Sequence, residues 1–233
     1  DETFTIHNGA VSATGTIVDN DNAPTVATIS PASATEGSPV VFDFTLSNPS
    51  AVDTSYTFTF INGTAGASDY TTTDVTVIVP AGATTGTVSV PTTQDTIDEL
   101  DETFTIHNGA VSAVGTIEDN DATPTVTITD VTVNEGAGTV SVPVTLSGPS
   151  SVATVIDIVT TTGTAGTADY TTTTTQVTIP AGSLTENVVI TITDDLLDEP
   201  NETFTVNGTL VSGTIDAANS DFIGEVTILD NDD

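Results

Sequence analysis

The sequence predicts an all-β protein, built as tandem seven-stranded immunoglobulin-like β-sandwiches. Two observations favour this class: apolar residues alternate with polar ones at a period of two, and whole segments recur along the chain. Thr, Val, Ile and Phe dominate the alternating segments, and Gly, Pro, Asn and Ser interrupt them at intervals of roughly 8–12 residues. That spacing predicts about seven short antiparallel strands in each repeat of roughly 100 residues.

Internal repetition defines the domains. Residues 1–21 match residues 101–121 with two substitutions, and the Gly-Thr-Ala-Gly of 63–66 recurs at 163–166. The Asp-Asn-Asp of 119–121 recurs at 230–232, which predicts an eleven-residue insertion around 215–224. We therefore expect the C-terminal fragment of a preceding repeat at 1–23, a complete repeat at 24–121 and a second complete repeat at 122–233. Because residue 1 falls inside a repeat, we expect the chain to be an excerpt of a longer protein.

The strands follow in order within the first complete repeat. Residues 40–46 alternate, with Val40, Phe42, Phe44 and Leu46 on one face. Further strands are expected at 57–60, 76–79, 87–90 and 103–106, with prolines at strand ends where no ladder donor is lost. The pairs Asn8-Gly9 and Asn108-Gly109 predict two-residue hairpin turns. At residues 207–208 of the last repeat, a tight turn and a bulge inside a strand remain equally open.

Composition excludes several classes of function. The 233 residues include 33 Asp and Glu but no Lys or Arg, giving a formal charge of −33. Such a chain has nothing to neutralise a nucleic acid backbone or an anionic lipid surface. No apolar run approaches the ~20 residues of a membrane span, so direct membrane insertion is not expected. There is no Cys, so a secreted protein of this kind needs another staple, and a metal ion is the usual alternative.

Acidic residues recur in turns rather than along strand faces. They lie in a Glu-Gly turn after the first strand, before a Tyr, in a central acidic stretch, and in the closing Asp-Asn-Asp. Because strands of a sandwich alternate in direction, these four places meet at one pole. Calcium takes six to eight oxygens, mostly from carboxylates, so we expect two to four Ca²⁺ ions per complete repeat. The candidate carboxylate ligands are Glu36, Asp69, Asp95, Glu99, Glu102, Asp119 and Asp121 in the first complete repeat, and Glu135, Asp169, Asp194, Asp195, Glu199, Glu202, Asp230 and Asp232 in the second.

The ordered motifs resemble the Calx-beta domain. They are Glu-Gly, Gly-Thr-Ala-x-x-x-Asp-Tyr, Pro-Ala-Gly, Asp-Asp-x-x-x-Glu-x-x-Glu-Thr-Phe and a closing Asp-x-Asp. The resemblance covers both complete repeats and the opening fragment. It implies a calcium cluster at the C-terminal pole of each sandwich, with the backbone carbonyl of Ile97 or Leu197 as a further ligand. Gln94 stands where the second repeat has Asp194, a departure from the family pattern at one ion of the first cluster.

The resemblance also suggests a function. Near-identical tandem copies without Lys or Arg look most like the repeats of a large bacterial cell-surface adhesin, secreted and extracellular, with a role in cell adhesion, biofilm formation or gliding motility. We expect calcium-rigidified stalk repeats whose partners are neighbouring repeats of the same chain, with a surface or carbohydrate ligand elsewhere in the protein. The alternative is a calcium-sensing regulatory module of a membrane transport or signalling protein. Enzyme activity is not expected, because no Ser-His-Asp arrangement is apparent and few aromatic residues exist to stack a sugar.

Overall fold

The computed structural model describes residues 1–232, which are almost entirely strands and turns. One short 3-10 helix, η1 (Glu135–Ala137), interrupts them, and no helix in the described chain could span a membrane. Contacts divide the chain into two compact units. The first contains β1 to β8 with most of β9 and β10, and the second contains β11 to β18 together with the loop segments 35–37 and 94–102.

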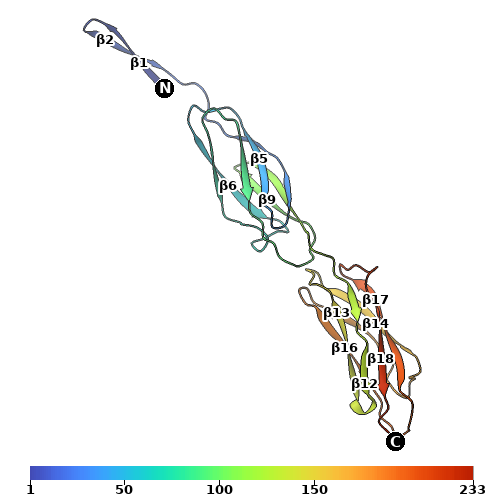
Figure 1. Ribbon diagram of the computed structural model, residues 1–233. Coiled ribbons are helices and arrows are strands. Elements are labelled where there is room, and N and C mark those ends of the chain that lie inside the picture. The colour runs from blue at the N-terminus through green and yellow to red at the C-terminus, as the bar shows by residue number, and fades with distance from the viewer. Residues whose placement is uncertain (233) are drawn as a thin grey trace. The chain divides into compact units, whose positions relative to one another are not determined.

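In the first unit, two sheets form a β-sandwich (Figure 1). The larger sheet has the order β4-β10-β9-β6-β7 and the smaller sheet the order β3-β5-β8. The strands of these two sheets are β3 (Val26–Ile29), β4 (Ala32–Thr35), β5 (Val40–Leu46), β6 (Thr54–Asn62), β7 (Val75–Val79), β8 (Thr85–Val90), β9 (Glu102–Asn108) and β10 (Val111–Glu118).

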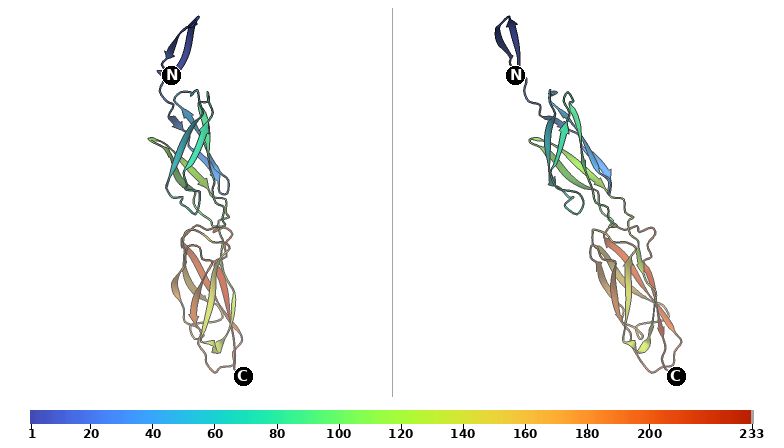
Figure 2. Two further views of the ribbon diagram at one scale, coloured as in Figure 1. Left: turned by 90° about the vertical axis from the view of Figure 1, so that its left-hand side faces the viewer. Right: turned by 60° about the vertical axis from the view of Figure 1, so that its left-hand side comes forward.

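The second unit repeats this arrangement, with sheets β12-β18-β17-β14-β15 and β11-β13-β16 (Figure 2). Its strands are β11 (Val126–Ile128), β12 (Val131–Asn134), β13 (Thr139–Leu146), β14 (Thr154–Thr162), β15 (Thr174–Ile179), β16 (Thr185–Thr191), β17 (Glu202–Ser212) and β18 (Ile223–Leu229). In both units the predicted first strand is split in two, at Ser30-Pro31 and at Thr129-Asp130, so that its halves join opposite sheets. The predicted β-sandwich class is confirmed.

The apolar alternation read from the sequence forms the core. Along β5, Val40, Phe42, Phe44 and Leu46 are buried while the intervening residues are exposed. Edge-to-face contact joins Phe42 to Phe104, with ring centroids 5.8 Å apart. In the second unit, the buried aliphatic residues Val142, Val144 and Ile158 stand where the first unit has Phe42, Phe44 and Phe58. Both cores are therefore built from the faces that the period of two predicted.

The chain opens with a β-hairpin, β1 (Glu2–Asn8) and β2 (Val11–Ile17). Its sequence is nearly that of β9 and β10, yet its apolar side chains lie outside any core: Phe4 is 49% exposed, whereas Phe104 is 1% exposed. The pairing Asn8↔Val11 makes Gly9-Ala10 the two-residue loop, and Gly9 has a φ of 60°. The predicted turn at Asn8-Gly9 was thus placed one residue too early, because the flexible glycine takes the first central position.

The last repeat differs from the first at its insertion. Asn207 and Gly208 lie inside the long strand β17, and the register shift falls further along, opposite Val155 and Ile156. The chain then loops out and returns so that the N–H of Asp221 donates to the carbonyl of Val126 at 2.7 Å. Residues 221–222 thus run beside β11 before β18 begins.

Candidate metal centres

Four groups of three carboxylates form where the sequence predicted acidic poles. Within each group, one oxygen from each residue lies within 4.8 Å of the others. Ligand oxygens lie about 2.3–2.6 Å from calcium, so opposite ligands of one ion are about 5 Å apart. Each group therefore has the spacing of part of a calcium coordination sphere. The groups are Glu36, Asp95 and Asp121; Asp69, Glu99 and Glu102; Glu135, Asp230 and Asp232; and Asp169, Glu199 and Glu202.

The parallel pairing of β12 with β18 positions one group of the second repeat. Asn134, the last residue of β12, lies opposite Leu229, the last residue of β18. Because the two strands end at the same level, Glu135 and Asp230 follow them side by side. The next residue, Gly136, donates its N–H to the side chain of Asn231 at 2.8 Å. This bond closes the Glu-Gly turn over the Asp-Asn-Asp segment.

A tight turn at 163–169 positions the other group. The carboxylate of Asp169 accepts the N–H of Gly166 at 2.6 Å, so this aspartate closes its own turn. The turn is tied to the start of β17, because the N–H of Ala165 donates to the carbonyl of Thr203 at 2.9 Å. A Cβ on Gly163 would lie 2.4 Å from that same carbonyl. The Gly-Thr-Ala motif therefore serves to bring Asp169 beside Glu202.

The central acidic stretch links the two groups. In the second repeat the N–H of Asp195 donates to Glu135 Oε1 at 3.1 Å, and Asp195 Oδ1 accepts the N–H of Leu197 at 2.7 Å. The first repeat reproduces both bonds at Asp95, each at 2.8 Å. Each of these aspartates thus holds a local turn with one oxygen while its backbone orients the glutamate of the Glu-Gly turn.

Burial makes these carboxylates costly to ionise in the absence of a cation. Glu135 is only 7% exposed, and burial together with the charges of Asp195 and Asp230 raises its pKa. Burial likewise raises the pKa of Glu36, Asp119 and Glu199, with neighbouring carboxylates acting in the same direction. For Glu202, burial, a hydrogen bond with Asp169 and the charges of Asp169 and Glu199 raise the pKa to about 7.

Some of the buried carboxylate oxygens have no hydrogen-bond donor among residues 1–232. They are Oδ1 of Asp119, Oδ2 of Asp121 and Oδ1 of Asp230. A buried acceptor without a donor is costly, and the chain contains no Lys or Arg to supply one. A hard cation would satisfy these oxygens. The donor set therefore fits calcium.

The structure sorts the predicted ligands. Twelve of them make up the four groups of three. Asp119 and Asp195 lie beside the groups, since they are among the charges that raise the pKa of Glu36 and Glu135 respectively. Asp194 lies outside the four groups, and its carboxylate accepts a hydrogen bond from the side-chain amide of Asn231 at 3.4 Å. The backbone N–H groups of Ile97 and Leu197 donate to the carboxylates of Asp95 and Asp195. The predicted role of the Ile97 and Leu197 carbonyls as calcium ligands stays a prediction.

Gln94 takes part in a different arrangement from its counterpart Asp194. Its amide pairs with the amide of Asn120 through two bonds, at 3.0 and 2.9 Å. Asn120 also donates to the carbonyl of Glu36 at 3.2 Å. The central Asn of each Asp-Asn-Asp thus holds the acidic pole together through hydrogen bonds. The sequence motifs did not predict this role for the Asn. Its recurrence at residues 120 and 231 was the available signal.

Comparison with known proteins identifies the family. The model of the Calx-beta domain matches residues 19–130 and again residues 118–232. A comparison with curated protein sequences found no match.

Solved structures are also similar. The apo form of the Calx CBD1 domain is 25% identical, covers 46% of this chain and 99% of its own, and gives a TM-score of 0.42. The calcium binding domain CBD12 of CALX1.1 is 15% identical, covering 78% of this chain and 79% of its own at a TM-score of 0.36. A tetra-tandem repeat in the extending region of a large adhesion protein is 14% identical, covering 93% of this chain and 51% of its own at a TM-score of 0.45. The chain thus spans about half the length of that last structure. Since the family model matches twice and covers most of the residues, the chain belongs to the Calx-beta domain family and carries two of its domains in tandem.

Proposed function

We propose that these repeats form a calcium-rigidified stalk segment of a secreted bacterial surface adhesin. The observation that carries the proposal is the convergence of carboxylates from separate loops, in a chain with no Lys or Arg. Without cations, the buried carboxylates repel one another and some of their oxygens have no donor. With Ca²⁺, each group is neutralised and the loops that contribute to it become fixed.

The near-identity of the opening fragment with the end of the first complete repeat supports a structural role over a sensing one. A stalk gains length from copies, and residues 1–21 and 101–121 differ at two positions only. Its partners would be neighbouring repeats of the same chain, and the adhesive contact with a surface or a carbohydrate would be made elsewhere in the protein. No catalytic step is assigned to the repeats. The second candidate is a calcium-sensing regulatory module. It would bind calcium as the stalk does, but its function would not require a stiff chain of repeats.

Thermal unfolding of the full chain, with calcium or with excess chelator, tests the metal. An ion at 100 times its Kd stabilises the folded state by about 2.7 kcal/mol per site, which corresponds to a rise in Tm of roughly 10–20 °C for a domain of this size. Sodium chloride at equal ionic strength is the first control, because simple screening would act with any salt. Asp95→Asn should reduce the rise, whereas Asp74→Asn, at an exposed position outside the groups, should leave it intact.

Small-angle scattering separates the two candidates. A stalk becomes longer and stiffer when calcium is added, so the maximum dimension should increase and its distribution narrow. Stabilisation without stiffening would favour the sensing module. If calcium and sodium chloride had the same effect on Tm, neither proposal would stand.

A further inference from the structure

One aspartate of the acidic stretch is buried by a contact that calcium does not explain. Asp98 is 5% exposed, although its counterpart Asp198 in the last repeat is exposed. We call residues 95–99 the acidic turn and residues 149–151 the receiving turn. Both belong to the second compact unit. Asp98 is outside the four carboxylate groups, so its burial needs another cause.

The contact is made by backbone and side chain together. The N–H of Asp98 donates to the carbonyl of Pro149 at 3.1 Å, and its carbonyl accepts the N–H of Ser151 at 3.0 Å. These bonds form an isolated parallel bridge between Asp98 and Ser150. The Ser150 hydroxyl lies 3.3 Å from Asp98 Oδ2 and 3.4 Å from the Asp98 carbonyl, and the Ser151 hydroxyl donates to that carbonyl at 3.2 Å. Ser150 is 1% exposed, so the two turns shield each other from water.

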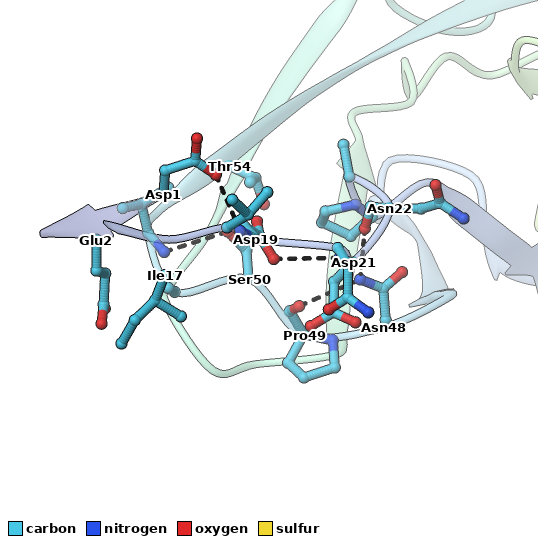
Figure 3. Close-up of a pocket in the computed structure, with 16 residues that line it drawn as sticks. Asp1, Glu2, Ile17, Asp19, Asp21, Asn22, Asn48, Pro49, Ser50 and Thr54 are labelled. Atoms are coloured by element: carbon cyan, nitrogen blue, oxygen red, sulfur yellow. Dashed lines mark hydrogen bonds between the residues drawn. The ribbon is translucent and has the colours of Figure 1, made fainter. Parts of the chain in front are cut away.

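A matched turn without such an occupant lies in the first unit. Ser50 stands at the place of Ser150, and its hydroxyl accepts the N–H of Val52 at 3.1 Å, as Ser150 does from Val152 at 3.4 Å. The carbonyls of both serines accept a glycine N–H, from Gly82 at 2.8 Å and Gly182 at 2.9 Å. Yet Ser50 is half-exposed and lines a cavity of about 740 Å³ (Figure 3). The turn therefore forms without Asp98, and the burial of Ser150 reflects the docked acidic turn.

We propose that the receiving turn is a binding site for the acidic turn, and that Asp98 is the positioning residue that fixes the loop carrying Asp95 and Glu99. The coupling to calcium rests on the proposed function. Asp95 and Glu99 lie in two different carboxylate groups. Asp95 is three residues before Asp98 in the sequence, and Glu99 directly follows it. When Asp98 is docked, the backbone that carries both is already ordered, so the ion meets a preorganised loop. By linkage, calcium and docking must strengthen each other by the same factor.

Hydrogen exchange measures docking directly. The amide of Ser151 donates across the contact, and the amide of Ala51, at the matching place in the first unit, is the internal reference. In the full chain, the Ser151 amide should exchange at least tenfold more slowly than that of Ala51. Ser150→Leu should abolish the difference by filling the place of Asp98. Ser50→Leu measures what leucine costs the turn itself and should leave the Ser151 amide unchanged. Equal exchange of the two amides in the unsubstituted protein would overturn the proposal.

Calcium titration by calorimetry tests the coupling. Asp98→Ala should weaken binding at the sites that contain Asp95 and Glu99 by about three- to tenfold, and calcium should slow exchange of the Ser151 amide by the same factor. Asp198→Ala removes an exposed aspartate at the equivalent position and should change neither quantity. Equal effects of the two alanine variants would refute a role for Asp98. If calcium does not bind at all, the proposed function fails, while exchange in the metal-free protein still decides whether the turns dock.

Discussion

The ring of Tyr170 stacks on the ring of Phe204, with centroids 3.9 Å apart and planes inclined by 10°. Tyr170 directly follows Asp169, and Phe204 lies two residues after Glu202, so the stack joins the two backbone segments that present these carboxylates. Tyr70 and Phe104 repeat it in the first complete repeat at 4.2 Å and 16°. The aromatic pair therefore sets the distance between loops that the candidate ligands require.

The two tyrosines differ in their hydroxyls, which predicts opposite effects of removing them. Tyr70 donates to Asn62 at 2.7 Å, whereas the buried hydroxyl of Tyr170 has no partner among residues 1–232. Tyr70→Phe should lower the free energy of unfolding by about 1 kcal/mol, and Tyr170→Phe should leave it unchanged or raise it slightly. Urea unfolding in excess chelator measures both. A loss of similar size in both variants would show that Tyr170 also has a donor or acceptor, such as a bound water.

Two phenylalanines with the same neighbours in sequence should respond very differently to truncation. Phe104→Ala removes a side chain from the core of the first unit and should cost about 3–5 kcal/mol. Phe4→Ala alters the exposed face of the hairpin and should cost less than about 1 kcal/mol. Denaturant unfolding of the full chain distinguishes them. A large cost for Phe4→Ala, especially one that grows with protein concentration, would mean that the hairpin face is buried against a second copy.

The raised pKa of Glu202 predicts a pH dependence of the metal-free protein. Between about pH 4.5 and about pH 7, folded Glu202 holds a proton that the unfolded chain has released. The folded state binds more protons in this window, so the free energy of unfolding should fall as pH rises through it. Calcium affinity should rise over the same range, because the ion competes with the proton.

Urea unfolding in chelator and calorimetric titration, each between pH 5 and pH 8, check these two trends. Glu202→Gln cannot lose a proton, so it should flatten the part of the stability profile near pH 7. A chelated protein that becomes more stable as pH rises through this window would contradict the assignment.

Exchanging Gln94 and its counterpart should alter calcium binding in opposite directions. Gln94→Asp adds a carboxylate beside Asp95 and breaks the amide pair with Asn120, so it should destabilise the metal-free protein by about 1 kcal/mol. It should also tighten calcium binding in the first complete repeat, by about tenfold, because ligand charge sets affinity. Asp194→Gln should weaken binding in the last repeat. Calorimetry on both variants measures the change, and shifts in the same direction would exclude a ligand role for position 194.

Much of the fold followed from local chemistry. The alternation along 40–46 placed Phe42 and Phe44 inside, because a period of two fixes which face of a strand each residue occupies. The acidic pole was predictable because strand alternation decides which loops share an end. The hairpin turn was misplaced by one residue, since Asn-Gly and Gly-Ala both offer a positive φ at the glycine and only strand register separates them.

Contacts between segments distant in sequence could not be predicted from local sequence patterns. Asp98 is one of five acidic residues among positions 95–102, and nothing local distinguishes it from its neighbours. Its burial depends on Ser150, 52 residues away. The split of the first strand also depends on both sheets being present, since each half pairs with a different partner. Position along the chain predicted which residues gather at a pole, but not which of them a neighbouring turn would cover.

The insertion of the last repeat changes how its smaller sheet meets solvent. Strand β11 stands at the margin of that sheet, and the N–H of Ile128 donates to Asp221, whose own N–H donates to Val126. These bonds use backbone groups that would otherwise be open to pairing with a foreign strand. The inserted residues thus cover this edge strand and prevent strands of other molecules from pairing with it. Such protection matters for a protein whose many similar strands would otherwise be templates for one another during folding.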